Sequence, residues 1–143
     1  MIYLDSTCLV RLYFEDAGYE RVRHLAASDF IACAQRGRAE VISAFHRKFR
    51  EHAISARVFK ITLQEFLNET RSEAFRWLPL SERVVERAEL VYARLPATIF
   101  LRAADALHLS TAAENGFRDI HSNDAKLLSA APHFGLRGVN VIH

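Results

Sequence analysis

This sequence lacks long apolar runs and the features of an exported chain. No hydrophobic stretch approaches the roughly 20 residues needed to cross a bilayer. The N-terminus has no basic segment followed by an apolar signal core, so nothing in it predicts export. Cysteine is also scarce: Cys8 and Cys33 are too few for a disulfide framework, and we expect both to be reduced core residues. These absences favour a cytoplasmic protein.

The chain also lacks a large excess of one charge, and it lacks linker segments. The net charge of +2 is too small to indicate a nucleic-acid-binding protein by itself. Only three basic residues are lysines and the other 16 are arginines, which favours phosphate recognition only weakly. The seven histidines show no zinc-ligand spacing. Without a repeat, a low-complexity tract or a Pro/Gly/Ser-rich linker, the 143 residues are predicted to form one domain.

Short apolar runs alternate with helical patterns along the chain. Strands are predicted at residues 2–4, 30–32, 118–121 and 139–142. Helices are predicted around residues 9–13, 19–27, 40–49, 59–67, 84–95 and 103–115, with a short one between Asp124 and Pro132. This alternation indicates an α/β fold with a mainly parallel sheet. Ligands of such open sheets bind beyond the carboxyl ends of the strands.

Four carboxylates occur where this architecture could bring them together. Asp5 ends the first strand, and Asp124 follows a later strand in "DIHSNDAKLL". Glu40 lies in the first turn of its helix, and Asp105 lies near the start of "LRAADALHLSTAAENG", a helix of small and apolar residues. A buried carboxylate on such a helix needs hydrogen-bond donors, a cation or a raised pKa.

Each acid has a purely structural explanation when taken alone. Asp5 and Asp124 could cap the helices that follow them, and Glu40 and Asp105 could be favourable charges near helix N-termini. Together, however, crowded carboxylates repel each other, and a hard divalent cation is the usual compensation. Metal ions held in this way polarise a phosphoryl oxygen and generate hydroxide, which suits cleavage of phosphate esters.

Four segments resemble, in order and spacing, the PIN-domain ribonucleases, with the strongest likeness to the VapC-type toxins of toxin–antitoxin pairs. They are "IYLDSTCLVRLYFED", "CAQRGRAEVISAF", "LRAADALHLSTAAENG" and "IHSNDAKLLSAAPHFGLRGVNVI", which span essentially the whole chain. The resemblance implies a single PIN domain over residues 1–143, with an α/β/α sandwich around a mainly parallel sheet. It also implies a Mg²⁺- or Mn²⁺-dependent endoribonuclease that acts on RNA such as tRNA or rRNA, pairs with a cognate antitoxin and forms a homodimer.

The same resemblance assigns roles to particular residues. The family's four acidic positions match Asp5, Glu40, Asp105 and Asp124. Asp5 and Asp105 are expected to be direct metal ligands, with Glu40 and Asp124 binding metal directly or through water.

Three hydroxyl residues are expected to support these acids. Ser6, with Thr7 beside it, matches the hydroxyl after the family's first Asp, and Ser122 matches the polar position two residues before the last acid. This chain reads Asp-Ser-Thr-Cys where Asp-Thr-Ser-Ala is commoner, which keeps a hydroxyl beside the acid.

Other side chains leave alternatives open. His108 stands one helical turn after Asp105 and could donate to it or to RNA, although a packed structural histidine is preferred. Arg36 and Arg38 could meet RNA phosphates or an acidic partner, or could simply be solvated. For the basic residues at 47, 48 and 50 we prefer a solvated helix face.

The aromatic residues and two other function classes also need weighing. Phe59, Phe66, Phe75 and Trp77 are expected in the core, although some could face an antitoxin helix. One alternative function is a PIN-like module that binds RNA or protein and has lost catalysis. Another is a small-molecule phosphohydrolase with an aspartyl nucleophile, which is disfavoured because Thr7 stands where a second Asp is usual.

Overall fold

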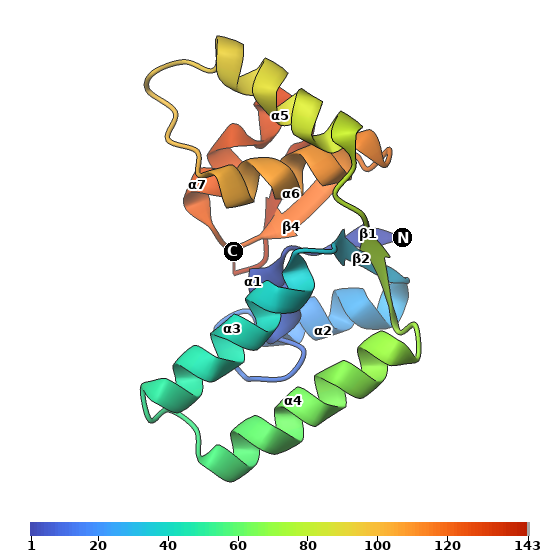
Figure 1. The fold of residues 1–143 in the computed structure, drawn as a ribbon, viewed down its shortest axis with the longest axis vertical. Coiled ribbons are helices and arrows are strands. Elements are labelled where there is room, and N and C mark those ends of the chain that lie inside the picture. Colours follow the sequence, from blue (N-terminus) through green and yellow to red (C-terminus); the bar gives the residue numbers. More distant parts are fainter. Residues whose placement is uncertain (143) are drawn as a thin grey trace.

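The computed structural model describes residues 1–142, and five short parallel strands form its centre (Figure 1). They are β1 (Ile2–Tyr3), β2 (Ile31–Ala34), β3 (Phe75–Leu78), β4 (Asp119–Ser122) and β5 (Arg137–Asn140). Strands β1, β2 and β3 pair in that order, and β4 pairs with β5. A parallel bridge between Leu4 and His121 joins the two groups. The strands therefore follow one another in the order β3-β2-β1-β4-β5, with their carboxyl ends on one side.

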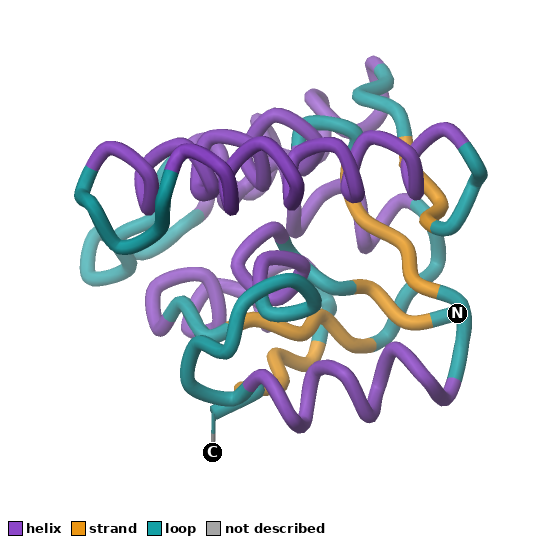
Figure 2. The backbone as a smooth tube through the Cα atoms, turned by 90° about the horizontal axis from the view of Figure 1, so that it is seen from below, coloured by secondary structure: helices purple, strands orange, loops and turns teal. Residues whose placement is uncertain are grey.

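Helices lie on both sides of the strands (Figure 2). Figure 1 shows α1 to α4 on one side and α5 to α7 on the other. They are α1 (Ser6–Val10), α2 (Tyr19–Ser28), α3 (Gly37–Arg50), α4 (Ala56–Arg71), α5 (Glu82–Arg94), α6 (Ala103–Glu114) and α7 (Ala125–Ala130), followed by a 3₁₀ turn (Ala131–Phe134). None of the helices within residues 1–142 combines the length and apolarity needed to cross a membrane. This arrangement is the expected α/β/α sandwich.

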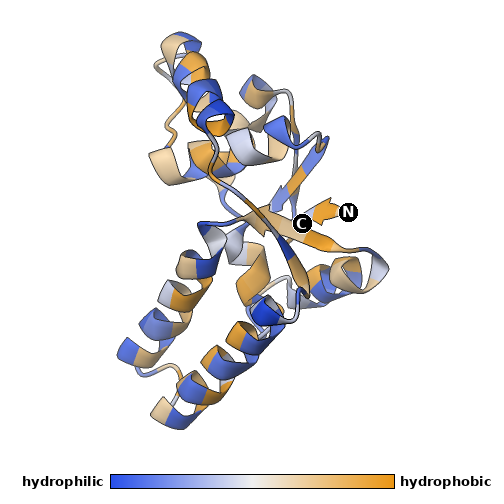
Figure 3. Ribbon diagram, turned by 45° about the vertical axis from the view of Figure 1, so that its right-hand side comes forward, coloured by the Kyte–Doolittle hydropathy of each residue, from blue (hydrophilic) through white to orange (hydrophobic). Residues whose placement is uncertain are grey.

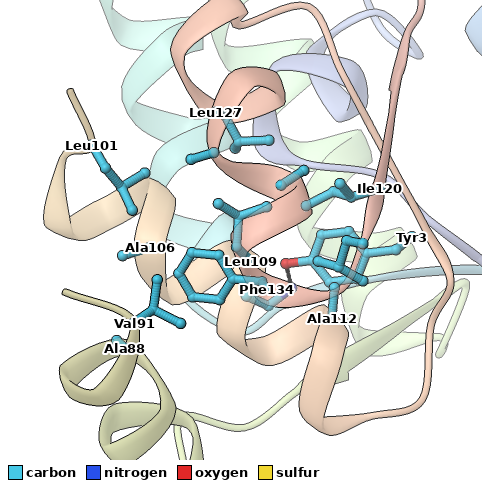
Figure 4. Close-up of a cluster of buried hydrophobic side chains, with 14 of the residues drawn as sticks. Tyr3, Ala88, Val91, Leu101, Ala106, Leu109, Ala112, Ile120, Leu127 and Phe134 are labelled. Carbon is cyan, nitrogen blue, oxygen red and sulfur yellow. Dashed lines mark hydrogen bonds between the residues drawn. The ribbon is translucent and has the colours of Figure 1, made fainter. Parts of the chain in front are cut away.

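The alternation of side chains along the strands separates two hydrophobic clusters. Tyr3 points into the cluster under α5, α6 and α7, which Figure 4 shows in close-up. Leu4, the next residue, points into the cluster under α1 to α4. Both faces of the strands are covered, and β1, β2 and β3 are largely apolar, whereas β4 and β5 each carry several polar residues. Helices α3, α4 and α5 alternate between polar and apolar residues (Figure 3).

The predicted elements are largely present, with three differences. Strand β3 was not predicted, because "FRWL" is a four-residue edge strand whose Arg76 is exposed, and this breaks the apolar run. Helix α1 ends at Val10, so the expected helical positions 12 and 13 lie in the turn that follows. The last strand is Arg137–Asn140 rather than 139–142. Gly116, with φ of +79°, follows α6 in the left-handed conformation that glycine adopts without strain.

The four aromatic residues expected in the core lie there to different degrees. Phe66 and Phe75 are buried, and Phe59 and Trp77 are half-buried against the same cluster. Both cysteines are buried and free of disulfides, as predicted.

Candidate active site

Asp5 lies at the carboxyl end of β1, buried, with 2% of its surface exposed. It caps α1: one carboxylate oxygen accepts hydrogen bonds from the Cys8 amide at 3.0 Å and the Thr7 hydroxyl at 2.6 Å. The other oxygen accepts a hydrogen bond from the Ser122 hydroxyl, which comes from the end of β4. The helix-capping explanation is therefore correct, but two hydroxyl groups from different elements also fix this carboxylate in one orientation.

Asp124 is joined to Asp5 through Ser122. The Asp124 amide donates to the Ser122 hydroxyl oxygen at 3.0 Å, while that hydroxyl donates to Asp5. The Asp124 carboxylate caps α7 by accepting from the amides of Lys126 and Leu127. Parallel pairing across the Leu4–His121 bridge explains why these two loops meet, because it aligns the ends of β1 and β4.

Asp105 faces Asp124 from the first turn of α6, and an arginine lies between them. Arg102, the residue before α6, donates to Asp105 at 3.3 Å and to Asp124 at 3.0 Å. Burial, and after it the negative charge of Asp124, raises the pKa of Asp105 above its ordinary value, although Arg102 opposes the rise. This part of the site thus holds more negative charge than one guanidinium offsets.

Glu40 is held by a chain of buried hydrogen bonds. The Ala34 amide donates to the Tyr3 hydroxyl oxygen at 3.1 Å, and the hydroxyl lies 2.7 Å from His108 Nδ1. An ionised Glu40 can only accept, so His108 Nε2–H donates to it at 2.7 Å, and Nδ1 of the neutral ring accepts the Tyr3 proton. Burial alone would raise the pKa of Glu40, but His108 and Arg36 lower it overall.

The structure therefore unites three of the predicted acids in one hydrogen-bonded network and places the fourth beside them. Asp5, Asp124 and Asp105 are connected through Ser122 and Arg102. Glu40 is tied through His108 to α6, the helix that also carries Asp105.

The remaining predicted residues have different surroundings. Thr7 rather than Ser6 supplies the hydroxyl that holds Asp5. Arg36 forms an ion pair with Glu40 at 3.4 Å, whereas Arg38 is exposed. His108 is buried between Tyr3 and Glu40, which agrees with the preferred structural reading and gives it a partner other than Asp105.

Oxygen-rich surroundings of this kind fit a hydrated divalent cation. Carboxylate oxygens are the donors that Mg²⁺ and Mn²⁺ prefer. Burial, and after it the charge of Asp124, raises the pKa of Asp105, and a bound cation would oppose this rise. Within residues 1–142, no three His, Cys, Asp or Glu side chains stand close enough to form a ready-made cage. Mg²⁺ usually takes only one or two carboxylates directly and keeps several waters, so it does not require such a cage.

Two contributors to the site were not predicted. Arg102 precedes Asp105 by three residues at a helix start, a spacing that brings side chains together and could have indicated the contact. Tyr3 gave no such signal, because its hydroxyl reaches residues 31 and 105 positions away in the chain.

A parallel sheet between two helical layers, with acids gathered at the strand ends, defines a class of α/β proteins with a polar site at that edge. Comparison with family models is more specific: the model described as "PIN domain" matches residues 2–132, and the chain belongs to that family.

Solved structures with the same fold cover nearly the whole chain. FitAcB from Neisseria gonorrhoeae has a TM-score of 0.75 at 18% identity, covering 100% of this chain and 99% of that one. FitAB bound to the IR36 DNA fragment has a TM-score of 0.74 at 18% identity, with 100% and 96% covered. The VapBC2 complex from Rickettsia felis, bound to a DNA fragment from its promoter, has a TM-score of 0.68 at 19% identity, with 98% of both chains covered. No curated protein matches the sequence.

Proposed function

We propose that this protein is a metal-dependent endoribonuclease and the toxin of a type II toxin–antitoxin pair. The observation that carries the proposal is the linked set of Asp5, Asp105 and Asp124 at the carboxyl ends of β1 and β4, with Glu40 beside it. Membership in the PIN domain family supports the nuclease assignment. Likeness of fold to the FitAB and VapBC2 complexes supports the assignment as a toxin.

In this proposal the acids hold Mg²⁺ or Mn²⁺. Asp5 and Asp105 are the direct ligands, and Glu40 and Asp124 bind the ion directly or through water. When bound, such an ion polarises a phosphoryl oxygen and lowers the pKa of a water molecule.

The other residues of the site prepare these acids for that task. Thr7 and Ser122 direct the Asp5 oxygens, and His108 keeps Glu40 ionised and in place. Water attacks the backbone phosphodiester in line, and no covalent enzyme intermediate forms.

Arg102 has a distinct role in this mechanism. Its guanidinium donates to Asp105 and Asp124, and its side chain is 58% exposed, so solvent reaches it. It reduces the repulsion between the two carboxylates. With a cation held by Asp105 and Asp124, the Arg102 donors would be available to a phosphate of the RNA.

The partners follow from the same assignment. The substrate is RNA, with tRNA or rRNA as the expected target. Arg36, which pairs with Glu40, and the exposed Arg38 at the start of α3 are proposed to contact the RNA backbone. A cognate antitoxin and a second copy of this chain complete the proposed assembly. Cytoplasmic localisation agrees with a toxin that acts on these RNAs.

The two other function classes gain no support from the geometry. The Thr7 hydroxyl donates to Asp5, so position 7 does not act as the second acid of an aspartyl phosphohydrolase. A module without catalysis would not need Ser122 and Thr7 to orient a buried carboxylate, and it is distinguished by the experiment below.

An RNA cleavage assay tests the proposal. It compares the wild-type protein with Asp5→Asn and Asp105→Asn on a labelled single-stranded RNA, with Mg²⁺ or Mn²⁺. Removing a group that only hydrogen-bonds to a metal ligand lowers metal affinity or activity by roughly 10- to 100-fold. Loss of either ligand itself is therefore expected to slow cleavage by at least about 100-fold. Asp119→Asn is the matched control, because Asp119 begins β4, at the opposite end from Ser122, and pairs with Arg137 of β5. Circular dichroism checks that each variant is folded. If Asp5→Asn cleaves RNA at the wild-type rate, the assignment is contradicted. If the wild type binds RNA but does not cleave it, the protein is better described as the inactive module.

A further inference from the structure

A second polar cavity lies next to the acidic site, on the side of α1 and α3. We call it the Arg11 pocket; it has a volume of about 210 Å³, and its polar lining consists of Thr7, Arg11, Asp16, Arg47, Lys48 and Asn123. Three of these side chains are cationic and one is a carboxylate. The solvated helix face expected for residues 47 and 48 is therefore part of a pocket wall.

The pocket and the acidic site share a wall. Thr7, which lines the pocket, donates its hydroxyl proton to Asp5. Asn123, which also lines it, lies in the chain between Ser122 and Asp124. The pocket therefore lies directly beside the carboxylates of Asp5 and Asp124.

Arg11 gives the pocket its chemical character. Its residue is only 7% exposed, and its guanidinium donates to the carbonyl oxygens of Ala17 at 2.6 Å and Thr7 at 2.7 Å and, at 3.5 Å, to the side-chain oxygen of Asn123, all of them neutral acceptors. Within residues 1–142 it forms no salt bridge with a carboxylate. Because a buried charge is costly without a counter-charge, this guanidinium favours an anion in the adjacent cavity.

Two more cations lie at the same cavity from α3. Lys48 donates to Asp16 at 2.8 Å, which offsets part of its charge. The Arg47 side chain is 68% exposed and lies 3.9 Å from Glu51, a weak surface pair that a stronger anion would displace. The apolar lining comes from Val10 and Ala44, which offers little to an aromatic or aliphatic side chain.

We propose that the Arg11 pocket binds a backbone phosphate of the RNA strand, adjacent to the phosphodiester that the acids engage. This inference rests on the proposed function. Carboxylates that hold a metal at one phosphate repel the neighbouring phosphates of the same strand. Cations on one side of the acids offset that repulsion and fix the direction in which the strand crosses the site.

Salt dependence of RNA binding tests the proposal, because each phosphate contact with a single strand contributes about 0.7 to the slope of log affinity against log salt. The protein is the full chain carrying Asp5→Asn, so that RNA stays intact, and the probe is a labelled single-stranded RNA in Mg²⁺. Because one phosphate contributes about 0.7 in total, the double variant Arg47→Gln/Lys48→Gln is expected to reduce the slope by about 0.7, and each single variant by part of that amount. Between 50 and 200 mM salt, the double variant then loses about 2.6-fold less affinity than its parent.

Two further variants make the result independent of folding defects. Arg50→Gln is the matched control, since Arg50 is exposed on the same helix and does not line the pocket. Asp16→Asn removes the pocket's carboxylate and is expected to tighten RNA binding, an effect that damage to the fold would not produce. In the active protein, Arg47→Gln is expected to raise KM with kcat unchanged.

The outcomes separate this inference from the proposed function. Equal slopes for Arg47→Gln and Arg50→Gln, with RNA still cleaved by the wild type, would overturn the pocket alone. Binding of a hexaglutamate peptide that Arg47→Gln abolishes, with RNA binding unchanged, would assign the pocket to an acidic protein segment instead. If the wild type does not cleave RNA and Asp5→Asn does not bind it, both proposals are overturned.

Discussion

Replacing Tyr3 with phenylalanine removes one oxygen atom from the chain of hydrogen bonds that holds Glu40. Tyr3 is completely buried, so no water replaces its hydroxyl. Burial also raises the pKa of Tyr3 well above its ordinary value, which keeps the hydroxyl protonated for donation to His108. Tyr3→Phe leaves the Ala34 amide and the Nδ1 atom of His108 without partners.

The expected cost follows from counting these two groups. A buried polar group that loses its partner costs about 1–3 kcal/mol, so the free energy of unfolding is expected to fall by about 2–6 kcal/mol. For a chain of this length, the lower bound corresponds to a decrease in Tm of at least about 5 °C. Typical domains have about 5–15 kcal/mol of stability, so the variant is expected to fold at room temperature in most of this range.

Thermal and urea unfolding of the metal-free protein measure this effect. Tyr13→Phe is the matched control, because its hydroxyl makes one hydrogen bond, at 2.8 Å, to the half-buried carboxylate of Glu69, which water can hydrate. That variant is expected to lose about 1 kcal/mol. If Tyr3→Phe costs no more than Tyr13→Phe, the buried hydrogen-bond chain does not stabilise the site as described.

Two further predictions concern Glu40 and the helix that carries it. His108 and Arg36 lower the pKa of Glu40 despite its burial, so its ionised form stabilises the fold above pH 4.5, the ordinary glutamate value, and this stability is lost as the pH falls through the lowered pKa. In Glu40→Gln the decrease in Tm below pH 4.5 should be shallower than in the wild type, and parallel curves would refute this. Gly37→Ala places a Cβ atom 2.6 Å from the Sγ atom of Cys33, which is expected to cost about 1–3 kcal/mol by overpacking. Adding Cys33→Ala removes that clash, so the double variant should recover part of the loss in urea unfolding, whereas simple additivity would show that the contact is not the cause.

Local patterns in the sequence were sufficient for most of the fold. Apolar runs and helical spacing predicted four of the five strands and the order of the helices, because each pattern depends on neighbours within a few residues. Strand β3 escaped prediction because the exposed Arg76 interrupts its apolar residues, and its four positions are too few to show alternation clearly.

The sequence by itself determined which residues could form the site. Asp5, Glu40, Asp105 and Asp124 were identified from their positions after strands and at helix starts and from the family resemblance. Their roles as metal ligands remain a prediction.

Only the tertiary structure decided how these residues are supported. The contacts of Tyr3 with His108, and of Ser122 with Asp5, join residues more than 100 positions apart in the chain. Such contacts depend on strand order and on the parallel bridge between β1 and β4, which no local pattern encodes. The Arg11 pocket has the same origin: packing of α1 against α3 turns basic residues that read as a solvated helix face into the wall of a cavity beside the acids.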